Sequence, residues 1–142
     1  MVLDRAWGIV GEYKNKLNPR KQGVGDAFLK WVLTNYANPQ RVEQVALKSR
    51  DDARKYDEFP GHRDLENFDP SDRIFVAVAC AHPDGPPILQ AADSKWIGWR
   101  EALETEGVRV DFLCADDIRV TFAKKFPDRR PLTRKNAGRP AK

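Results

Sequence analysis

The clearest structural signal in the chain is the stretch Asp69-Pro-Ser-Asp72-Arg-Ile-Phe-Val-Ala-Val-Ala79. Asp69 suits the N-cap of a helix, because its side chain accepts a hydrogen bond from a free backbone N–H, and proline suits the first helical position. From Ile74 to Ala81 every residue is apolar or small. We therefore expect a helix that begins at Asp69 and is buried on nearly all sides.

The segments after this helix alternate between strand and helix. Prolines and a glycine in His82–Pro87 break the helix, and the short apolar run Ile88–Ala92 is typical of a central strand in a parallel sheet. Ser94–Glu106 predicts another helix, and Val108–Leu113 predicts another strand. This alternation predicts an α/β domain built on a parallel sheet.

The segments before Asp69 are more helical. Ile9–Leu17 carries apolar residues at helical spacing, and a second helix is expected from an N-cap at Asp26 to Asn38. Three further segments carry weaker signals. They are Val2-Leu3, which is compatible with the end of a strand, Val42–Leu47, which is ambiguous between a strand and a helical turn, and the charged residues 48–68, which predict a surface loop.

The composition indicates one domain in a reducing compartment. With 142 residues, 41% of them hydrophobic, the chain can bury one sizeable core. The mean hydropathy is −0.65, and no apolar run approaches the length of a membrane span. The start, Met1–Trp7, lacks the features of a secretory signal. Cys80 and Cys114 lie in apolar surroundings, where we expect small buried thiols. These features favour a cytoplasmic protein with no membrane partner.

The charge is divided unevenly along the chain. Residues 119–142 carry nine Lys or Arg and one Asp, a balance of +8. Since the whole chain has 25 basic and 21 acidic residues, residues 1–118 hold sixteen basic and twenty acidic ones, a balance of −4. An acidic body suits a metal site and a basic tail suits phosphate. We expect residues 119–142 to form a disordered tail, which either binds nucleic acid or only aids solubility.

Three carboxylates, Glu12, Asp72 and Asp93, are candidates for a metal site. Sites in open α/β sheets form beyond the carboxyl ends of strands, and Asp93 directly follows a predicted strand. Asp72 lies in the first turn of the buried helix, and Glu12 lies within Ile9–Leu17. Each also has a structural interpretation: Asp93 as a helix cap, Asp72 as a charge favoured at a helix start, and Glu12 as an exposed helical residue.

The chemistry of such carboxylates points to phosphodiester hydrolysis. Carboxylates held close together repel one another and bind Mg²⁺ or Mn²⁺ through oxygen. The metal orients a water molecule, lowers its pKa and neutralises charge that builds on a phosphate. No Ser/His/Asp triad and no glycine-rich phosphate loop is evident in the sequence. His62 and His82 are expected at the surface.

Together these segments resemble a PIN domain, the family of metal-dependent nucleases that includes many toxins of bacterial toxin–antitoxin modules. The resemblance lies in Asp72–Ala79, in Ile88-Leu-Gln-Ala-Ala-Asp93-Ser-Lys-Trp96, and upstream in Ile9-Val-Gly-Glu12-Tyr13. It covers about residues 1–118. It implies a three-layer α/β/α parallel-sheet domain, with Glu12, Asp72 and Asp93 as catalytic metal ligands for Mg²⁺ or Mn²⁺, and single-stranded RNA as the substrate.

The chain departs from the family pattern at two places. The family's first strand normally ends in an Asp some tens of residues before the Glu, and Asp4 is too close to Glu12 to replace that Asp. The first strand is therefore expected to be missing, as in an N-terminally truncated domain. A misplaced start, a partner chain that supplies the strand, or a degraded remnant would each explain its loss. Second, Lys95 stands where the family often has an acidic residue, and an ammonium there would repel a metal or contact phosphate.

The resemblance leads to two alternative functions. The first is a PIN-like ribonuclease of the toxin or RNA-processing type, for which RNA, an antitoxin and a second copy in a homodimer are the partners to consider. The alternative is a catalytically inactive PIN-like module that binds nucleic acid or a partner protein. A third and weaker hypothesis comes from Thr133–Pro140, which is similar to the Gly-Arg-Pro core of minor-groove hooks but has Ala137 where a second Arg is expected.

Overall fold

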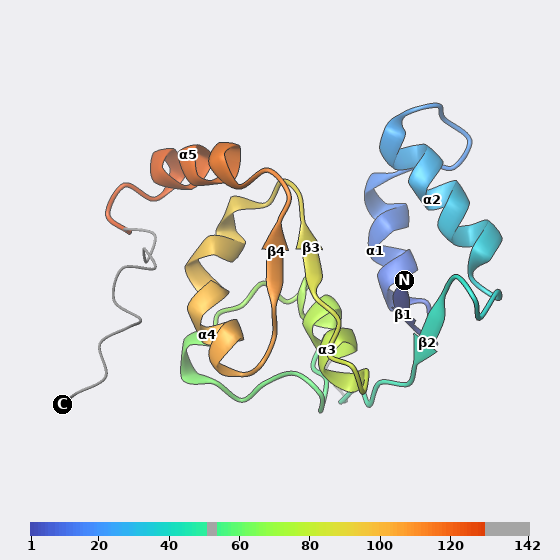
Figure 1. The fold of residues 1–142 in the computed structure, drawn as a ribbon, viewed down its shortest axis with the longest axis horizontal. Helices are drawn as coiled ribbons and strands as arrows, with labels where there is room; N and C mark the ends of the chain where they lie inside the picture. The colour runs from blue at the N-terminus through green and yellow to red at the C-terminus, as the bar shows by residue number, and fades with distance from the viewer. Residues whose placement is uncertain (51–53, 130–142) are drawn as a thin grey trace.

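The computed structural model describes residues 1–50 and 54–129 (Figure 1). Helices and short parallel strands alternate along it, in agreement with the α/β class. In chain order the elements are β1 (Val2–Asp4), α1 (Gly8–Lys16), α2 (Val24–Asn35), β2 (Glu43–Val45), the 3₁₀ turn η1 (Arg63–Leu65), α3 (Arg73–Ala81), β3 (Ile88–Gln90), the 3₁₀ segment η2 (Ser94–Trp99), α4 (Arg100–Thr105), β4 (Val110–Phe112) and α5 (Ala115–Lys125).

The strands form two small parallel sheets. β1 pairs with β2, placing Leu3 opposite Gln44, and β3 pairs with β4, placing Leu89 opposite Asp111. Within the described ranges no ladder joins the two pairs, so the single sheet expected from the sequence is not formed. β3 has β4 as its one strand partner there, and Leu89 is 62% exposed. β3 is therefore not the buried central strand that the sequence predicted.

Helix α3 lies between the two strand pairs and joins two hydrophobic cores (Figure 1). Ile74 and Val78 belong to the core that contains Leu3 of β1. Val76 belongs to the other core, and Phe75 packs against both. The prediction of a helix buried on nearly all sides is confirmed. Its start is corrected, because the N-cap is Asp72 and the helix proper begins at Arg73.

The segment Val2-Leu3, whose sequence is compatible with the end of a strand, forms β1, which ends in Asp4. Asp4 is 2% exposed, and its two carboxylate oxygens accept the N–H groups of Gly8 and Ile9 at 2.8 and 2.9 Å. Gly8 permits a close approach of α1 to α3, since a Cβ at this position would collide with the side chain of Ile74. Asp4 therefore ties the end of β1 to the first turn of α1.

The C-terminal boundary also needs correction. The expected tail, residues 119–142, begins inside α5, which runs to Lys125. Phe122 of α5 is 2% exposed and its ring lies against Gly98 of η2. The folded body therefore extends through α5. Residues 130–142, which include the hook-like segment Thr133–Pro140, lie outside the described residues.

Several local expectations change as well. The N-cap of α2 is Gly23 and not Asp26. The Asp26 carboxylate accepts the backbone N–H of Gly23 at 3.2 Å.

The exposure of three further side chains differs from the expectation. Both cysteines, Cys80 and Cys114, are exposed. His82 is buried, and its Nε2 lies 2.7 Å from the Glu43 carboxylate of β2. In the described part of the chain no helix combines the length and apolar character that a bilayer crossing requires.

Replacing Asp4 with alanine tests the turn after β1. The substitution leaves the N–H groups of Gly8 and Ile9 without an acceptor, and each unsatisfied buried donor costs about 1–3 kcal/mol. We expect Asp4→Ala to lower the free energy of unfolding in urea by about 2 kcal/mol or more. Asp116→Ala is the control, because the Asp116 side chain is 98% exposed. An equal, small loss in both variants would contradict this role for Asp4.

Candidate functional site

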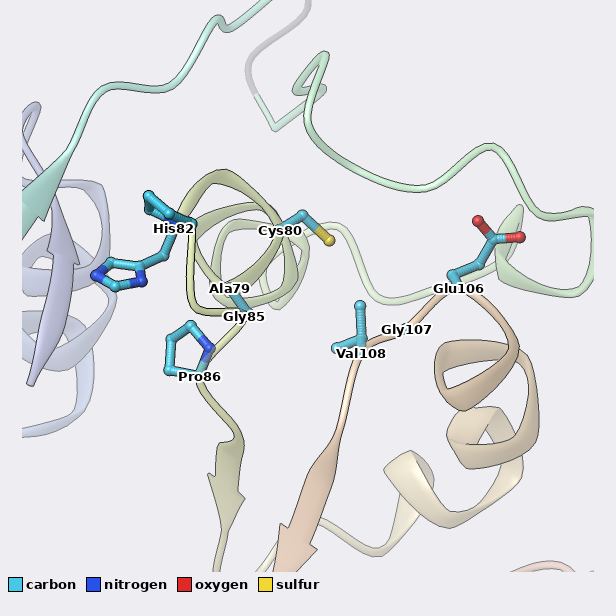
Figure 2. A pocket seen from close by; sticks show the side chains of 9 residues that line it. Ala79, Cys80, His82, Gly85, Pro86, Glu106, Gly107 and Val108 are labelled. Atoms are coloured by element: carbon cyan, nitrogen blue, oxygen red, sulfur yellow. The ribbon is translucent and has the colours of Figure 1, made fainter.

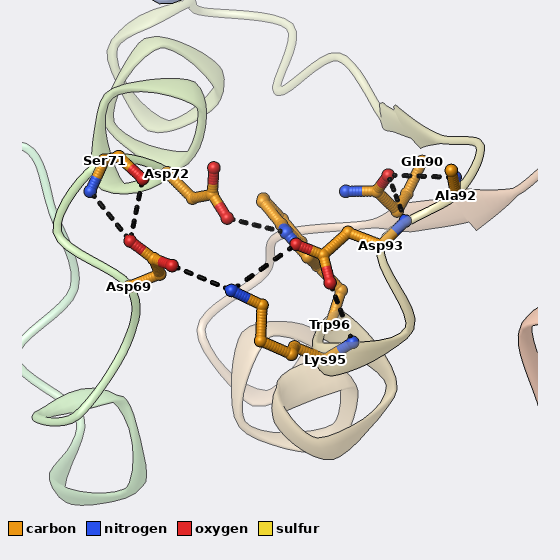
Figure 3. A network of polar contacts seen from close by, with 8 residues as sticks. All are labelled: Asp69, Ser71, Asp72, Gln90, Ala92, Asp93, Lys95 and Trp96. Carbon is orange, nitrogen blue, oxygen red and sulfur yellow. Dashed lines mark hydrogen bonds and ion pairs between the residues drawn. The ribbon is translucent and has the colours of Figure 1, made fainter. Parts of the chain in front are cut away.

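Three aspartates meet where α3 begins and β3 has ended (Figure 3). Asp72 is the N-cap of α3, Asp93 is the N-cap of η2 in the turn that follows β3, and Asp69 precedes α3. We call Asp69, Asp72 and Asp93 the aspartate cluster. Burial raises the pKa of Asp72, and the negative charges of Asp69 and Asp93 raise it further. Asp72 and Asp93 thus lie near one another, and their joint function stays a prediction.

Lys95 places its ammonium between two members of the aspartate cluster. Its Nζ lies 2.8 Å from Oδ2 of Asp69 and 3.6 Å from Oδ2 of Asp93. Hydrogen bonds from Lys95 and from Ser71 lower the pKa of Asp69 to about 2. The hydrogen bond to Asp69 in turn raises the pKa of Lys95. The two pKa shifts agree, so at neutral pH Asp69 is negatively charged and Lys95 is positively charged.

Asp72 is held by a buried aromatic residue. Trp96 is 2% exposed and packs edge-to-face against Phe68 with ring centroids 5.0 Å apart. Its indole N–H donates to Oδ2 of Asp72 at 3.2 Å. Because the indole is fixed by core packing, it fixes the position of the carboxylate as well.

Asp93 is held by the turn between β3 and η2. Its backbone N–H donates to the side-chain oxygen of Gln90 at 3.2 Å, and its Oδ1 accepts the backbone N–H of Lys95 at 3.0 Å. The cap interpretation of Asp93 is therefore correct, and its Oδ2 still faces Lys95. The neighbouring Ser94 is fully buried, and its hydroxyl has no hydrogen-bond partner within the described residues.

Glu12 does not join the aspartate cluster. Its carboxylate lies on α1, 3.8 Å from Arg54, and no interaction connects it to Asp72 or Asp93 in the described part of the structure. Its charge instead acts on Tyr56, whose pKa is raised by burial and then by Asp4 and Glu12. The acidic candidates therefore form two groups, the aspartate cluster and the pair Asp4 and Glu12.

The donor atoms of the aspartate cluster fit a hard divalent cation in kind. Carboxylate oxygens are the ligands that Mg²⁺ and Mn²⁺ prefer, and two of these carboxylates already face one positive centre. Their positions differ from those of a metal centre, since residues 1–50 and 54–129 contain no group of three His, Cys, Asp or Glu that could hold a metal ion as the side chains lie. The ammonium of Lys95 stands between the carboxylates that would form such a group.

The roles of two aspartates were missed by sequence reasoning, one in the aspartate cluster and one in the fold. Asp69 was assigned only as a helix cap, whereas its carboxylate binds Lys95. Asp4 was set aside because of its spacing from Glu12, yet it ends β1 and binds the backbone at the start of α1. Its position between a strand and a helix was the signal that could have identified this structural role.

A pocket of about 270 Å³ lies at the other end of α3 (Figure 2). It is lined by Cys80 and His82 from the end of α3 and by Glu106 and Val108 from the turn after α4. His82 already uses both ring nitrogens, since Nε2 faces Glu43 and Nδ1 accepts the backbone N–H of Asp84. The pocket is separate from the aspartate cluster, which lies at the start of α3.

The low pKa of Asp69 predicts a change in acid stability. Its folded pKa of about 2 lies below the ordinary 3.8, so this carboxylate stabilises the fold above pH 4 and loses that contribution as the pH falls from 4 towards 2. We expect Asp69→Asn to lose less stability than the wild type over this range in urea unfolding followed by tryptophan fluorescence. Asp116→Asn is the exposed control, and equal acid slopes for the wild type and Asp69→Asn would argue against the Lys95 pair.

Comparisons with known proteins give no relative of this chain. No protein-family model, no curated protein and no solved structure matches it.

Proposed function

We propose that the chain is a PIN-like, metal-dependent ribonuclease that hydrolyses phosphodiester bonds in single-stranded RNA. The supporting observation is that Asp72, at the start of α3, accepts a hydrogen bond from Trp96 of η2, the segment that Asp93 caps after β3, so carboxylates from two separate elements lie near one another (Figure 3). In this proposal the two strand pairs and the helices around them belong to a three-layer α/β/α arrangement. A toxin-type or RNA-processing role, with an antitoxin or a second copy as partner, belongs to the same proposal.

The proposed roles follow from how each carboxylate is held. Asp72 and Asp93 would hold Mg²⁺ or Mn²⁺, with Trp96 and Gln90 fixing their positions through hydrogen bonds. The metal, when bound, supplies an activated water and neutralises phosphate charge. Glu12 is proposed as a further ligand from the resemblance alone, because it lies with Asp4 and Arg54 rather than with Asp72.

Amide substitutions test this assignment. We expect Asp72→Asn and Asp93→Asn each to lower Mn²⁺-dependent cleavage of a single-stranded RNA by about 100-fold or more, since residues that merely orient ligands are worth 10- to 100-fold. Asp116→Asn should leave cleavage unchanged. Glu12→Gln tests whether Glu12 acts together with the aspartate cluster. A loss of RNA cleavage comparable to that of the Asp variants would place Glu12 in the site. Full cleavage by both Asp variants would exclude the assignment.

The position of Lys95 favours a second candidate function. An ammonium 2.8 Å from Asp69 and 3.6 Å from Asp93 neutralises charge that would otherwise attract a metal ion. The alternative is therefore a PIN-like module that binds RNA without cleaving it. Its affinity would come from the Lys and Arg residues concentrated after residue 118.

Binding measurements separate the two candidates. For the inactive module we expect RNA binding that persists in EDTA, with log K falling against log salt at a slope of about −0.7 for each neutralised phosphate. The measurement is fluorescence anisotropy with a labelled RNA between low and moderate salt. Cleavage of that RNA by the purified chain in Mn²⁺, lost in Asp72→Asn, would reject the inactive module in favour of the nuclease.

A further inference from the structure

The ammonium of Lys95 lies where the aspartate cluster needs a positive charge (Figure 3). Its Nζ faces carboxylate oxygens from both sides, Asp69 at 2.8 Å and Asp93 at 3.6 Å. No other cation of the described residues forms an ion pair with either aspartate. Lys95 is therefore the internal counter-ion of this cluster.

The fold does not require the Lys95 ammonium for its backbone. The Asp93 cap uses the backbone N–H of Lys95, which any residue except proline supplies. The side chain of Lys95 is 41% exposed, so its stem adds little to the buried core. What the ammonium does is bring positive charge to Asp69 and Asp93.

An ammonium and a divalent cation use the same carboxylate oxygens. Lys95 is tethered two residues from Asp93, so its ammonium stays close to the cluster whatever the concentration of ions in solution. A metal ion that binds Asp69 and Asp93 has to displace this ammonium. The displacement breaks the charged hydrogen bond from Lys95 to Asp69. The lysine stem is flexible enough to turn into solvent when displaced.

We propose that Lys95 is a built-in competitor for divalent metal, which lowers the affinity of the aspartate cluster for Mg²⁺ or Mn²⁺ and brings Asp69 into the metal-binding group once it moves away. This inference rests on the proposed nuclease function, because it concerns the same carboxylates. It makes Lys95 a residue that sets the metal concentration at which the cluster fills.

Metal binding, measured apart from cleavage, tests the competitor. We expect Lys95→Ala to bind Mn²⁺ about 10- to 100-fold more tightly than the wild type in calorimetric titration, because a hydrogen bond between charged groups no longer has to be broken. Lys95→Met keeps the length of the stem and should behave alike, and Lys95→Asp should bind at least as tightly. Arg100→Ala is the matched control, since it removes a neighbouring cation that pairs with Glu104 at 2.8 Å.

The Asp69 background makes the test specific. If Lys95 competes through Asp69, then Lys95→Ala raises Mn²⁺ affinity much less in an Asp69→Asn chain. Unchanged Mn²⁺ affinity in folded Lys95→Ala and Lys95→Met, or an equal gain in Arg100→Ala, would overturn the proposal. A gain in binding with no RNA cleavage by any variant would keep the competitor and reject the nuclease. RNA cleavage by the wild type, with no gain in Mn²⁺ affinity in the Lys95 variants, would keep the nuclease and reject the competitor.

Discussion

The structure depends on the burial of one short helix, α3. Its apolar residues serve two cores at once: Ile74 and Val78 pack towards β1, whereas Val76 packs towards Phe68 and Trp96. The two strand pairs share no hydrogen-bonded ladder within the described residues, so this helix provides the packing between them. The aspartate cluster inherits its position from the same helix, because Asp72 is its N-cap.

What the sequence could predict was local. The burial of α3 was evident because Ile74 to Ala81 contains no charged residue, and Asp93 was correctly placed after a strand as a cap. For β1 the sequence gives only a weak signal at Val2-Leu3, because three residues are too few to show a periodicity and their pairing depends on β2, forty-one residues away in the register Val2 to Glu43. Pairing at that distance is set by tertiary packing rather than by local propensity.

The candidate site shows the same limit. Asp72 and Asp93 were found because each stands at an element boundary, whereas Asp69 was assigned only as a cap. The contact of Lys95 with Asp69 spans twenty-six residues, and it depends on how the turn before α3 approaches η2. Glu12 was grouped with Asp72 by resemblance, but its neighbours are Arg54 and Tyr56. Residue type and spacing identify candidate ligands; which of them meet is decided by packing.

Helix α5 has a consequence for the mechanics of the molecule. Phe122 rests on Gly98 in η2, the 3₁₀ segment whose first residues are Ser94, Lys95 and Trp96. A 3₁₀ segment has weaker hydrogen-bond geometry than an α-helix, so it relies on outside support for its shape. α5 therefore supports the segment that carries Trp96, which holds Asp72, and Lys95, which neutralises Asp69. The position of the aspartate cluster therefore depends on the packing of α5 against η2 as well as on α3.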